Sequence, residues 1–80
     1  MAEDADARVC RVFGARLREF RRRQKLTQSD IAERAGVSLM YVSQIERGLR
    51  NPTLAVVVRL AHAVDVTACD LISGVDPPTD

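Results

Sequence analysis

Four residues, Ala35-Gly36-Val37-Ser38, constrain the fold of this chain more than any other feature of its sequence. They separate two short segments, 28–35 and 39–47, whose apolar residues have helical spacing. Gly36 is suited to end the first helix because glycine readily takes the left-handed conformation there. Ser38 is a favourable N-cap for the second helix. So short a turn makes the two helices cross steeply, which predicts a helix-turn-helix whose second helix is exposed.

Three further segments have the apolar spacing of helices, and no segment alternates like a strand. The first helix is expected around an apolar stripe made of Val9, Val12, Phe13, Leu17 and Phe20. Thr53 is the expected N-cap of a fourth helix. Its predicted inward stripe is Leu54, Val57, Val58, Leu60, Ala61 and Val64. Thr27 and Asp30 have the spacing of a capping box, which predicts that the helix before Gly36 starts at Gln28. Thr67 and Asp70 have the same spacing, which predicts a short last helix.

A chain of 80 residues has room for a single hydrophobic core. Aromatic residues make up only 4% of the chain, so the core must use small and medium side chains, which suit closely packed short helices. We therefore predict an all-α fold, a compact five-helix bundle, with its folded domain at residues 9–72. Residues 1–8 are expected to form a mobile arm or the start of the first helix, and the polar residues 73–80 a mobile tail.

Positive charge is concentrated in the first third of the chain. Residues 8–25 contain eight arginine or lysine residues and one acid, although the net charge of the whole chain is only +1. Such a block indicates a face that binds an anion. A charge run is also commonly an ordinary solvated helix face, and both interpretations stay open for the arginines of this block.

Several functional classes lack the residues that they need. No apolar run is long enough to span a membrane, and the acidic start MAEDADA has no apolar segment of a secretory signal. Cys10, Cys69 and the single His62 cannot supply a structural zinc site, so we expect no metal and no cofactor. The sequence shows neither a nucleophile–base pair nor a pair of carboxylates that would indicate an enzyme.

The two cysteines indicate a cytosolic setting with free thiols. A redox switch at Cys10 or Cys69 is the alternative to a role as a small buried or half-buried residue. His62 is expected to be a surface residue, since it is offset from the apolar stripe of its helix.

The stretch LTQSDIAERAGVSLMYVSQIERGLRNPTL resembles the helix-turn-helix domain of the lambda repressor/Cro type, also called XRE-like. The resemblance covers residues 13–72. It depends on several features at fixed spacing: Leu26-Thr27-Gln28, Ala32, Gly36-Val37-Ser38, the run from Ser43 to Gly48, and Arg50-Asn51-Pro52. It implies a lambda repressor-like DNA-binding domain that binds double-stranded operator DNA as a homodimer.

The resemblance also implies which residues read bases from the second motif helix. These are Leu39, Met40, Tyr41, Ser43 and Gln44. Gln44 is the most informative, because an amide can bond an adenine edge in two places. Met40 and Leu39 have no polar group, so they would contact only thymine methyl groups. The alternative for Met40 is an ordinary exposed side chain with no role in binding. Tyr41 is expected to be exposed, with core packing as the alternative.

A second set is expected to contact phosphates. It comprises Thr27, Gln28, Arg22, Arg23, Arg47, Arg50 and Asn51. Gln28 lies at a helix N-terminus, where backbone N–H groups and the helix dipole favour an anion. Arg22 and Arg23 belong to the basic block, for which a solvated face is the alternative. Arg21 and Glu46 match a structural ion pair of the family, so we expect Arg21 to pair rather than to contact DNA.

Two departures from the family pattern predict features of this chain. The family commonly has glycine where Lys25 and Asp65 stand, so left-handed residues there would each cost up to about 1 kcal/mol. Ala55 and Val56 also stand at positions where the family more often has polar residues. Ala55 and Val56, with Leu71 and Ile72, are therefore expected to form an exposed apolar dimer seam. The alternative is that Leu71 or Ile72 is purely a core residue.

These features together predict a sequence-specific DNA-binding transcriptional regulator that acts in the cytoplasm and is encoded by a bacterium or phage. Repression would follow from occupying promoter DNA, and activation from a contact with RNA polymerase. The chain is either a stand-alone regulator or the DNA-binding part of a longer one. The alternative is a protein-interaction module with the same fold, such as an antitoxin or a coactivator.

Overall fold

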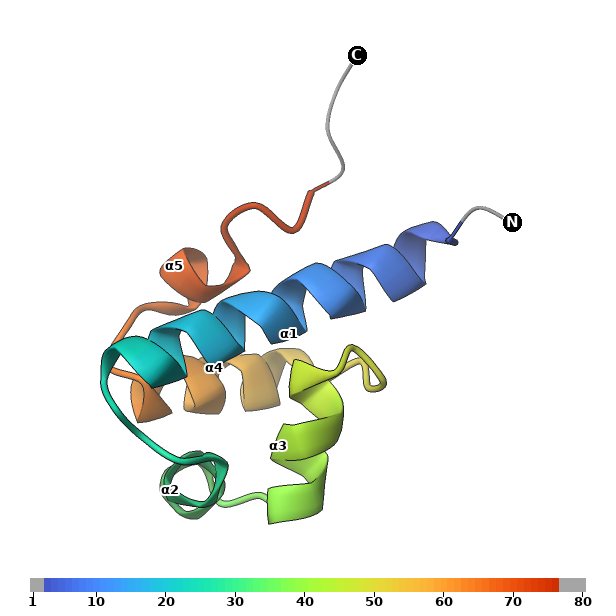
Figure 1. The fold of residues 1–80 in the computed structure, drawn as a ribbon. Helices are drawn as coiled ribbons and strands as arrows, with labels where there is room; N and C mark the ends of the chain where they lie inside the picture. The colour runs from blue at the N-terminus through green and yellow to red at the C-terminus, as the bar shows by residue number, and fades with distance from the viewer. Residues whose placement is uncertain (1–2, 77–80) are drawn as a thin grey trace.

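The computed structural model describes residues 3–76. Within them lie five helices, α1 (Ala5–Arg23), α2 (Gln28–Ala35), α3 (Leu39–Glu46), α4 (Leu54–Ala63) and α5 (Ala68–Ile72). In Figure 1, α5 lies above the long helix α1, whereas α2 and α3 lie below it. Helix α3 packs on α1 and α2, and α4 packs on α2 and α5. The all-α, five-helix prediction is confirmed.

Local capping accounts for where most helices begin. The Asp4 side chain accepts a hydrogen bond from the Ala7 N–H at 2.8 Å and starts α1. Residues 5–8, expected as a mobile arm or a helix start, are therefore the first turn of α1. The predicted capping boxes are both present, at Thr27 and Asp30 before α2 and at Thr67 and Asp70 before α5. Residues 1–2 of the expected arm lie outside the described residues.

The residue after the C-cap of α1, and the one after the C-cap of α4, are left-handed although neither is glycine. Lys25 and Asp65 both have φ of 57°, at the two positions where the family commonly has glycine. Each of these residues costs up to about 1 kcal/mol relative to glycine. Gly36 ends α2 with φ of 70°, as the motif turn predicts.

All five helices contribute to one core of mostly aliphatic side chains. Its buried members are Phe13, Leu17, Ile31, Ala32, Ala35, Val42, Ile45, Val56, Val57, Leu60, Ala61, Ala63, Val64 and Leu71. The only charged residue among the buried side chains of residues 3–76 is Glu46. This core fixes the orientation of α3 relative to α1 and α2.

The inward face of α4 differs from the predicted stripe. Leu54 is 76% exposed and Val58 also faces solvent, whereas Val56 is buried. Helix α4 packs against both α2 and α5, so its buried arc is wide and centred away from the row that holds Leu54 and Val58. The predicted inward positions of these two residues are therefore wrong.

The chain after α5 stays close to the helices as far as it is described. Val75 is partly buried against the core, and Arg8 Nη1 donates to the Val75 carbonyl oxygen at 3.4 Å. Residues 77–80 of the expected mobile tail lie outside the described residues. No helix within residues 3–76 combines the length and hydropathy that a membrane crossing needs.

Candidate DNA interface

Helix α3 presents one face to solvent and buries the other. The buried side consists of Val42, Ile45 and Glu46. The outer side consists of Leu39, Met40, Ser43, Gln44 and Arg47, which recur at helical spacing. Met40 is 70% exposed. The burial of one side by α1 and α2 therefore leaves four of the five expected base readers on a single outer face.

Two shallow grooves flank this outer face. One is lined by Gln28, Leu39, Met40, Ser43, Gln44 and Arg47. The other is lined by Val37, Ser38, Met40, Tyr41, Gln44 and Arg50. Met40 and Gln44 line both grooves, so they form the ridge between them. Three residues expected to contact phosphates, Gln28, Arg47 and Arg50, border the same surface.

Tyr41 is less exposed than expected. Its side chain is partly buried against the core, and the guanidinium carbon of Arg50 lies 4.8 Å from the centroid of its ring. The prediction that Tyr41 is simply exposed is therefore wrong, because the ring packs on the core and also supports Arg50. Arg50 in turn donates from Nη1 to Gln44 Oε1 at 3.2 Å.

Glu46 lies behind the outer face, at the centre of a polar cluster. Arg21 donates to it twice, from Nε to Oε2 at 2.6 Å and from Nη2 to Oε1 at 2.9 Å. Gln28 Nε2 donates to Oε1 at 3.1 Å, and Arg18 Nε at 3.4 Å. Arg21 also donates to the Leu26 carbonyl oxygen. The expected partners Arg21 and Glu46 are thus brought together, and they tie α1 to α3 and to the start of α2.

Electrostatics keep Glu46 charged despite its burial. Burial by itself would raise the pKa of the carboxyl, but hydrogen bonds from Arg21 and Gln28 and the charge of Arg21 lower it below its ordinary value. The same pairing raises the pKa of Arg21. Because Gln28 gives one amide hydrogen to Glu46, its other hydrogen and its carbonyl oxygen remain for an external ligand. The Thr27 hydroxyl oxygen accepts from the Asp30 N–H as the α2 cap.

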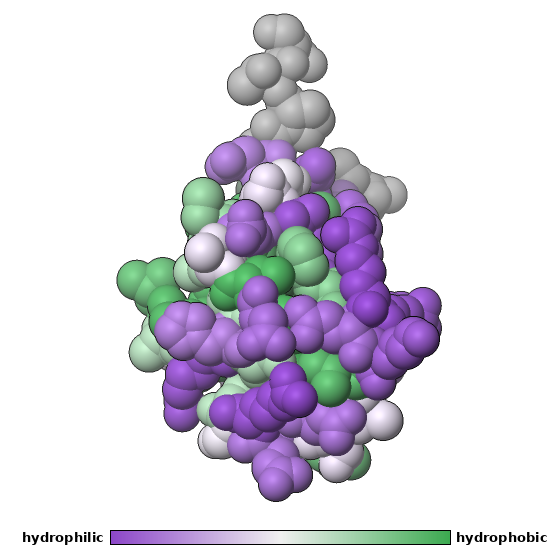
Figure 2. Space-filling view, turned by 90° about the vertical axis from the view of Figure 1, so that its left-hand side faces the viewer, coloured by the Kyte–Doolittle hydropathy of each residue, from purple (hydrophilic) through white to green (hydrophobic). Residues whose placement is uncertain are grey.

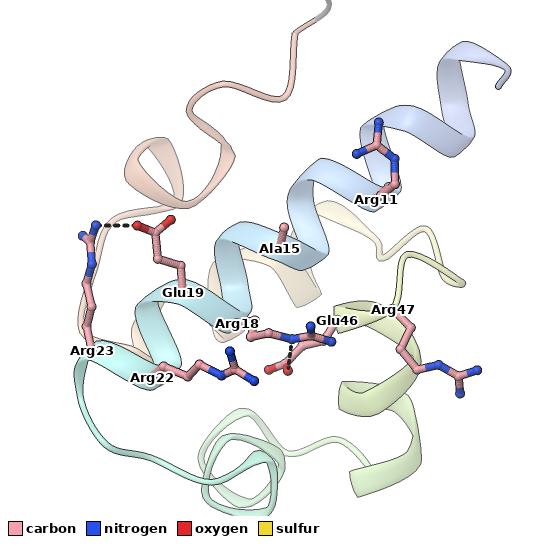
Figure 3. Close-up of a pocket in the computed structure, with 8 residues that line it drawn as sticks. All are labelled: Arg11, Ala15, Arg18, Glu19, Arg22, Arg23, Glu46 and Arg47. Carbon is pink, nitrogen blue, oxygen red and sulfur yellow. Dashed lines mark hydrogen bonds and ion pairs between the residues drawn. The ribbon is translucent and has the colours of Figure 1, made fainter. Parts of the chain in front are cut away.

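A basic hollow extends the surface along α1. It is lined by Arg11, Ala15, Arg18, Glu19, Arg22, Arg23, Glu46 and Arg47. Figure 3 shows Arg22 directed toward Arg18 and Glu46, whereas Arg23 turns away and pairs with Glu19. Arg11 is held by the Glu3 carboxylate at 3.0 Å. Sequence reasoning did not assign Arg11 and Arg18 to the DNA interface. The spacing of seven residues from Arg11 to Arg18, and of four from Arg18 to Arg22, indicates one helix face.

The last turn of α1 carries Arg21, Arg22 and Arg23. Figure 2 shows the side of the molecule that lies on the left in Figure 1, where α1 ends. Hydrophilic residues predominate on this side, and hydrophobic residues form separate areas among them. The three arginines of this turn have different surroundings: Arg21 belongs to the partly buried pair with Glu46, Arg22 faces the hollow, and Arg23 pairs with Glu19 at the surface.

Of the four residues expected in the dimer seam, two are buried and two are exposed. Leu71 is 0% exposed and Val56 is also buried, whereas Ile72 is 43% exposed and Ala55 is exposed. The prediction of an exposed Val56 is wrong, and for Leu71 the alternative of a purely core residue is confirmed, because both complete the core. The large exposed apolar side chains of α4 are Leu54 and Val58.

The remaining candidates lie away from the grooves beside α3. Asn51 is exposed and borders a small apolar hollow with Cys10 and Ile72. Cys10 is half-buried, but Cys69 is exposed, so the expected burial of Cys69 is wrong. His62 is exposed as predicted. Within the described part of the chain, no group of histidine, cysteine and acidic residues is arranged to hold a metal ion.

A family match, curated relatives and solved structures all relate this chain to helix-turn-helix regulators. Residues 17–71 match the helix-turn-helix family HTH_3. The chain is 36% identical over 66 residues to an HTH-type transcriptional regulator, y4dJ, of Sinorhizobium fredii, covering 82% of this chain and 86% of the relative. The restriction-modification controller protein C.AhdI of Aeromonas hydrophila is similar in structure, with a TM-score of 0.76 and 39% identity over 78% of this chain and 94% of C.AhdI.

The clp gene regulator ClgR of Corynebacterium glutamicum is also similar, with a TM-score of 0.78 and 30% identity over 80% of this chain and 82% of ClgR. The protein folds as a five-helix domain with an exposed α3 and has these similarities. It is therefore an HTH-type DNA-binding transcriptional regulator, not an enzyme. The chain belongs to the XRE/Cro-like helix-turn-helix family of transcriptional regulators.

Proposed function

We propose that this protein represses transcription by binding operator DNA as a homodimer, with α3 of each copy in a major groove. The outer face of α3 carries this proposal. Leu39, Met40, Ser43 and Gln44 lie on that face, and an α-helix with such a face fits the width of the major groove. Met40 and Leu39 offer apolar contact to thymine methyl groups, whereas Ser43 and Gln44 offer hydrogen bonds.

Phosphate contacts would hold α3 in this orientation. Arg47 follows α3 directly and is exposed, and Gln28 lies in the first turn of α2 beside it. Arg22 borders the basic hollow that continues from Arg47 along α1. We assign these three residues to the sugar-phosphate backbone. The assignment extends to Arg50, Asn51, Thr27 and Arg23, of which Arg23 is the least available because it pairs with Glu19.

A homodimer would give the selectivity that one motif lacks. Two copies related by a two-fold axis read two half-sites about 34 Å apart, one turn of DNA. The seam is best assigned to the exposed apolar side chains of α4 and α5, Leu54, Ala55, Val58 and Ile72. Helix α3 packs on α1 and α2, so a seam on the solvent-facing sides of α4 and α5 leaves α3 free in both copies.

Occupation of promoter DNA in the bacterial cytoplasm would then exclude RNA polymerase and repress the gene. Activation would instead need a direct contact between a bound copy and RNA polymerase. Transcription of a promoter that contains the operator separates the two mechanisms, since repression lowers transcript yield and activation raises it.

The salt dependence of binding tests the phosphate contacts. Arg47→Ala and Arg22→Ala should each weaken binding to every DNA sequence and reduce the slope of log affinity against log salt by about one. Arg8→Ala is the matched control, since Arg8 faces the segment after α5, and it should leave the slope unchanged. If both test variants keep the wild-type slope, this surface does not contact the backbone of DNA.

A further inference from the structure

Two side chains of α3, Tyr41 and Gln44, form a connected unit with Arg50 of the loop that follows the helix. Arg50 Nη1 lies 3.2 Å from Gln44 Oε1, and the Arg50 guanidinium carbon lies 4.8 Å from the Tyr41 ring centroid. All three line the same groove beside the outer face of α3. Arginine carries only hydrogen-bond donors. Only the oxygen end of the Gln44 amide can therefore face Arg50, so this contact fixes which end of the amide remains for DNA.

We propose that Arg50 is a positioning residue that makes Gln44 select guanine rather than adenine in the major groove. The inference rests on the proposed function, in which α3 enters that groove. With its carbonyl oxygen held by Arg50, Gln44 presents its amide NH₂ group to the base edge. Both hydrogens of that group require acceptors on the DNA.

The two purines differ at the atom that decides this preference. Both have N7 as an acceptor, but position 6 of guanine is an acceptor oxygen, whereas position 6 of adenine is a donor amino group. A glutamine that is free to orient bonds adenine with both ends of its amide. A glutamine whose oxygen is turned toward Arg50 points its NH₂ group at the base, so the adenine amino group meets a second donor. Guanine therefore becomes the better partner.

Tyr41 accounts for how an exposed arginine can hold this position. A long side chain at the surface loses rotamer entropy when it is fixed in one geometry. The Tyr41 ring is itself fixed because it packs on the core. A guanidinium over a tyrosine ring gains a cation–π interaction, which offsets part of that entropy. Arg50 is thus held against the Tyr41 ring and directed at Gln44.

The test compares base pairs at one operator position, the position at which Gln44→Ala abolishes the base preference. The DNA probes carry G·C, A·T or inosine·C there. Inosine keeps the N7 and O6 acceptors of guanine but lacks the minor-groove amino group. The wild type should bind the G·C and inosine·C probes equally, and about tenfold more tightly than the A·T probe.

Variants then separate positioning from a simple phosphate contact. Arg50→Ala should reduce the G·C over A·T ratio to about threefold or less, or reverse it, because the amide is released. In the Gln44→Ala background, Arg50→Ala should leave the ratio unchanged. Tyr41→Phe keeps the ring and should retain the preference, whereas Tyr41→Leu should reduce it. Because Arg50 is exposed, its removal should not alter the circular dichroism of the fold.

The contrary results are distinct. If Arg50→Ala weakens binding to all three probes by the same factor, Arg50 is only a phosphate contact and the inference is overturned. A wild type that prefers A·T over G·C at this position also overturns it. A chain that binds no DNA with sequence preference overturns the proposed function itself.

Discussion

Gly14 lies directly against the end of α3, so that a Cβ atom placed on it would be 2.2 Å from the carbonyl oxygen of Ile45. The nearest atoms are backbone, which cannot rotate away as a side chain can. Glycine in the middle of α1 is otherwise unfavourable, since alanine is the better helix former by about 1 kcal/mol. The close approach of α1 and α3 is therefore the reason for glycine at this position.

Gly14→Ala should destabilise the protein, although the same change in an open helix is stabilising. The added methyl group must push α3 away from α1, and overpacking of this kind costs about 1–3 kcal/mol. Urea unfolding measures the change. Ala15→Ser is the control, because Ala15 is exposed on the same turn, and it should stay within about 0.5 kcal/mol of the wild type. A Gly14→Ala variant that is more stable than the wild type would contradict the close packing.

Removing either partner of the Arg21–Glu46 pair should be costly. Glu46 is only 4% exposed. The loss of Arg21 leaves this buried carboxylate only the contacts with Arg18 and Gln28, and the loss of Glu46 leaves the partly buried Arg21 without its carboxylate partner. We expect a loss of about 3 kcal/mol for Glu46→Ala or Arg21→Ala. In a double-mutant cycle, the two losses should not add, because the second removal takes away a charge that has already lost its main partner. Losses below about 0.5 kcal/mol, the range of exposed pairs, would rule out a structural role.

The pH dependence of stability should report the charge on Glu46. Its pKa in the folded protein is lowered from the ordinary value of 4.5, so folding favours the ionised form. The resulting stabilisation is complete above about the unfolded pKa and is lost as the pH falls through the lower, folded pKa. Glu46→Gln should therefore be less stable at neutral pH, and its stability should fall less steeply in acid.

Some acid sensitivity should remain in the Glu46→Gln variant. The pKa of Asp30 is lowered by hydrogen bonds from Thr27, and that of Glu3 by the hydrogen bond from Arg11. Denaturant melts between pH 3 and pH 7 would measure both chains. Parallel curves for the wild type and Glu46→Gln would show that the Glu46 pKa is not lowered on folding.

A charge in the proposed dimer seam should separate the copies without unfolding them. Val58 and Ile72 are exposed in the single chain, so Val58→Asp and Ile72→Asp should give folded monomers with weakened operator binding. Val56→Asp is the contrasting variant, since Val56 is buried, and it should unfold the chain. Sedimentation and circular dichroism distinguish these results. A wild type that stays monomeric at high concentration and binds DNA as one copy would refute the seam.

Local chemistry explains which parts of the fold were predictable. A cap such as Thr27 with Asp30 acts within four residues, so sequence spacing is sufficient to place the start of α2. The left-handed Lys25 and Asp65 were predictable because the family has glycine at these positions. The inward face of α4 was not, since Val56 is buried by helices that are distant in the sequence. Spacing alone does not state which neighbours a helix will have.

In the candidate site, too, some features follow from local spacing and others depend on tertiary contacts. The outer face of α3 follows from helical spacing, because Val42 and Ile45 fix which side is buried. The contact of Arg50 with Gln44 crosses the end of α3, and it depends on how the loop after Gly48 turns. Neither this contact nor the partial burial of Tyr41 has a signal in the spacing of residues.

The most direct test of the central claim compares operator DNA with a scrambled sequence of the same length, for the wild type and for Gln44→Ala. If the outer face of α3 reads bases, Gln44→Ala should weaken operator binding by about 1–3 kcal/mol and leave binding to the scrambled DNA nearly unchanged. Fluorescence anisotropy at one fixed salt concentration measures both affinities. Equal losses on the two DNA sequences would contradict a base-reading role for α3.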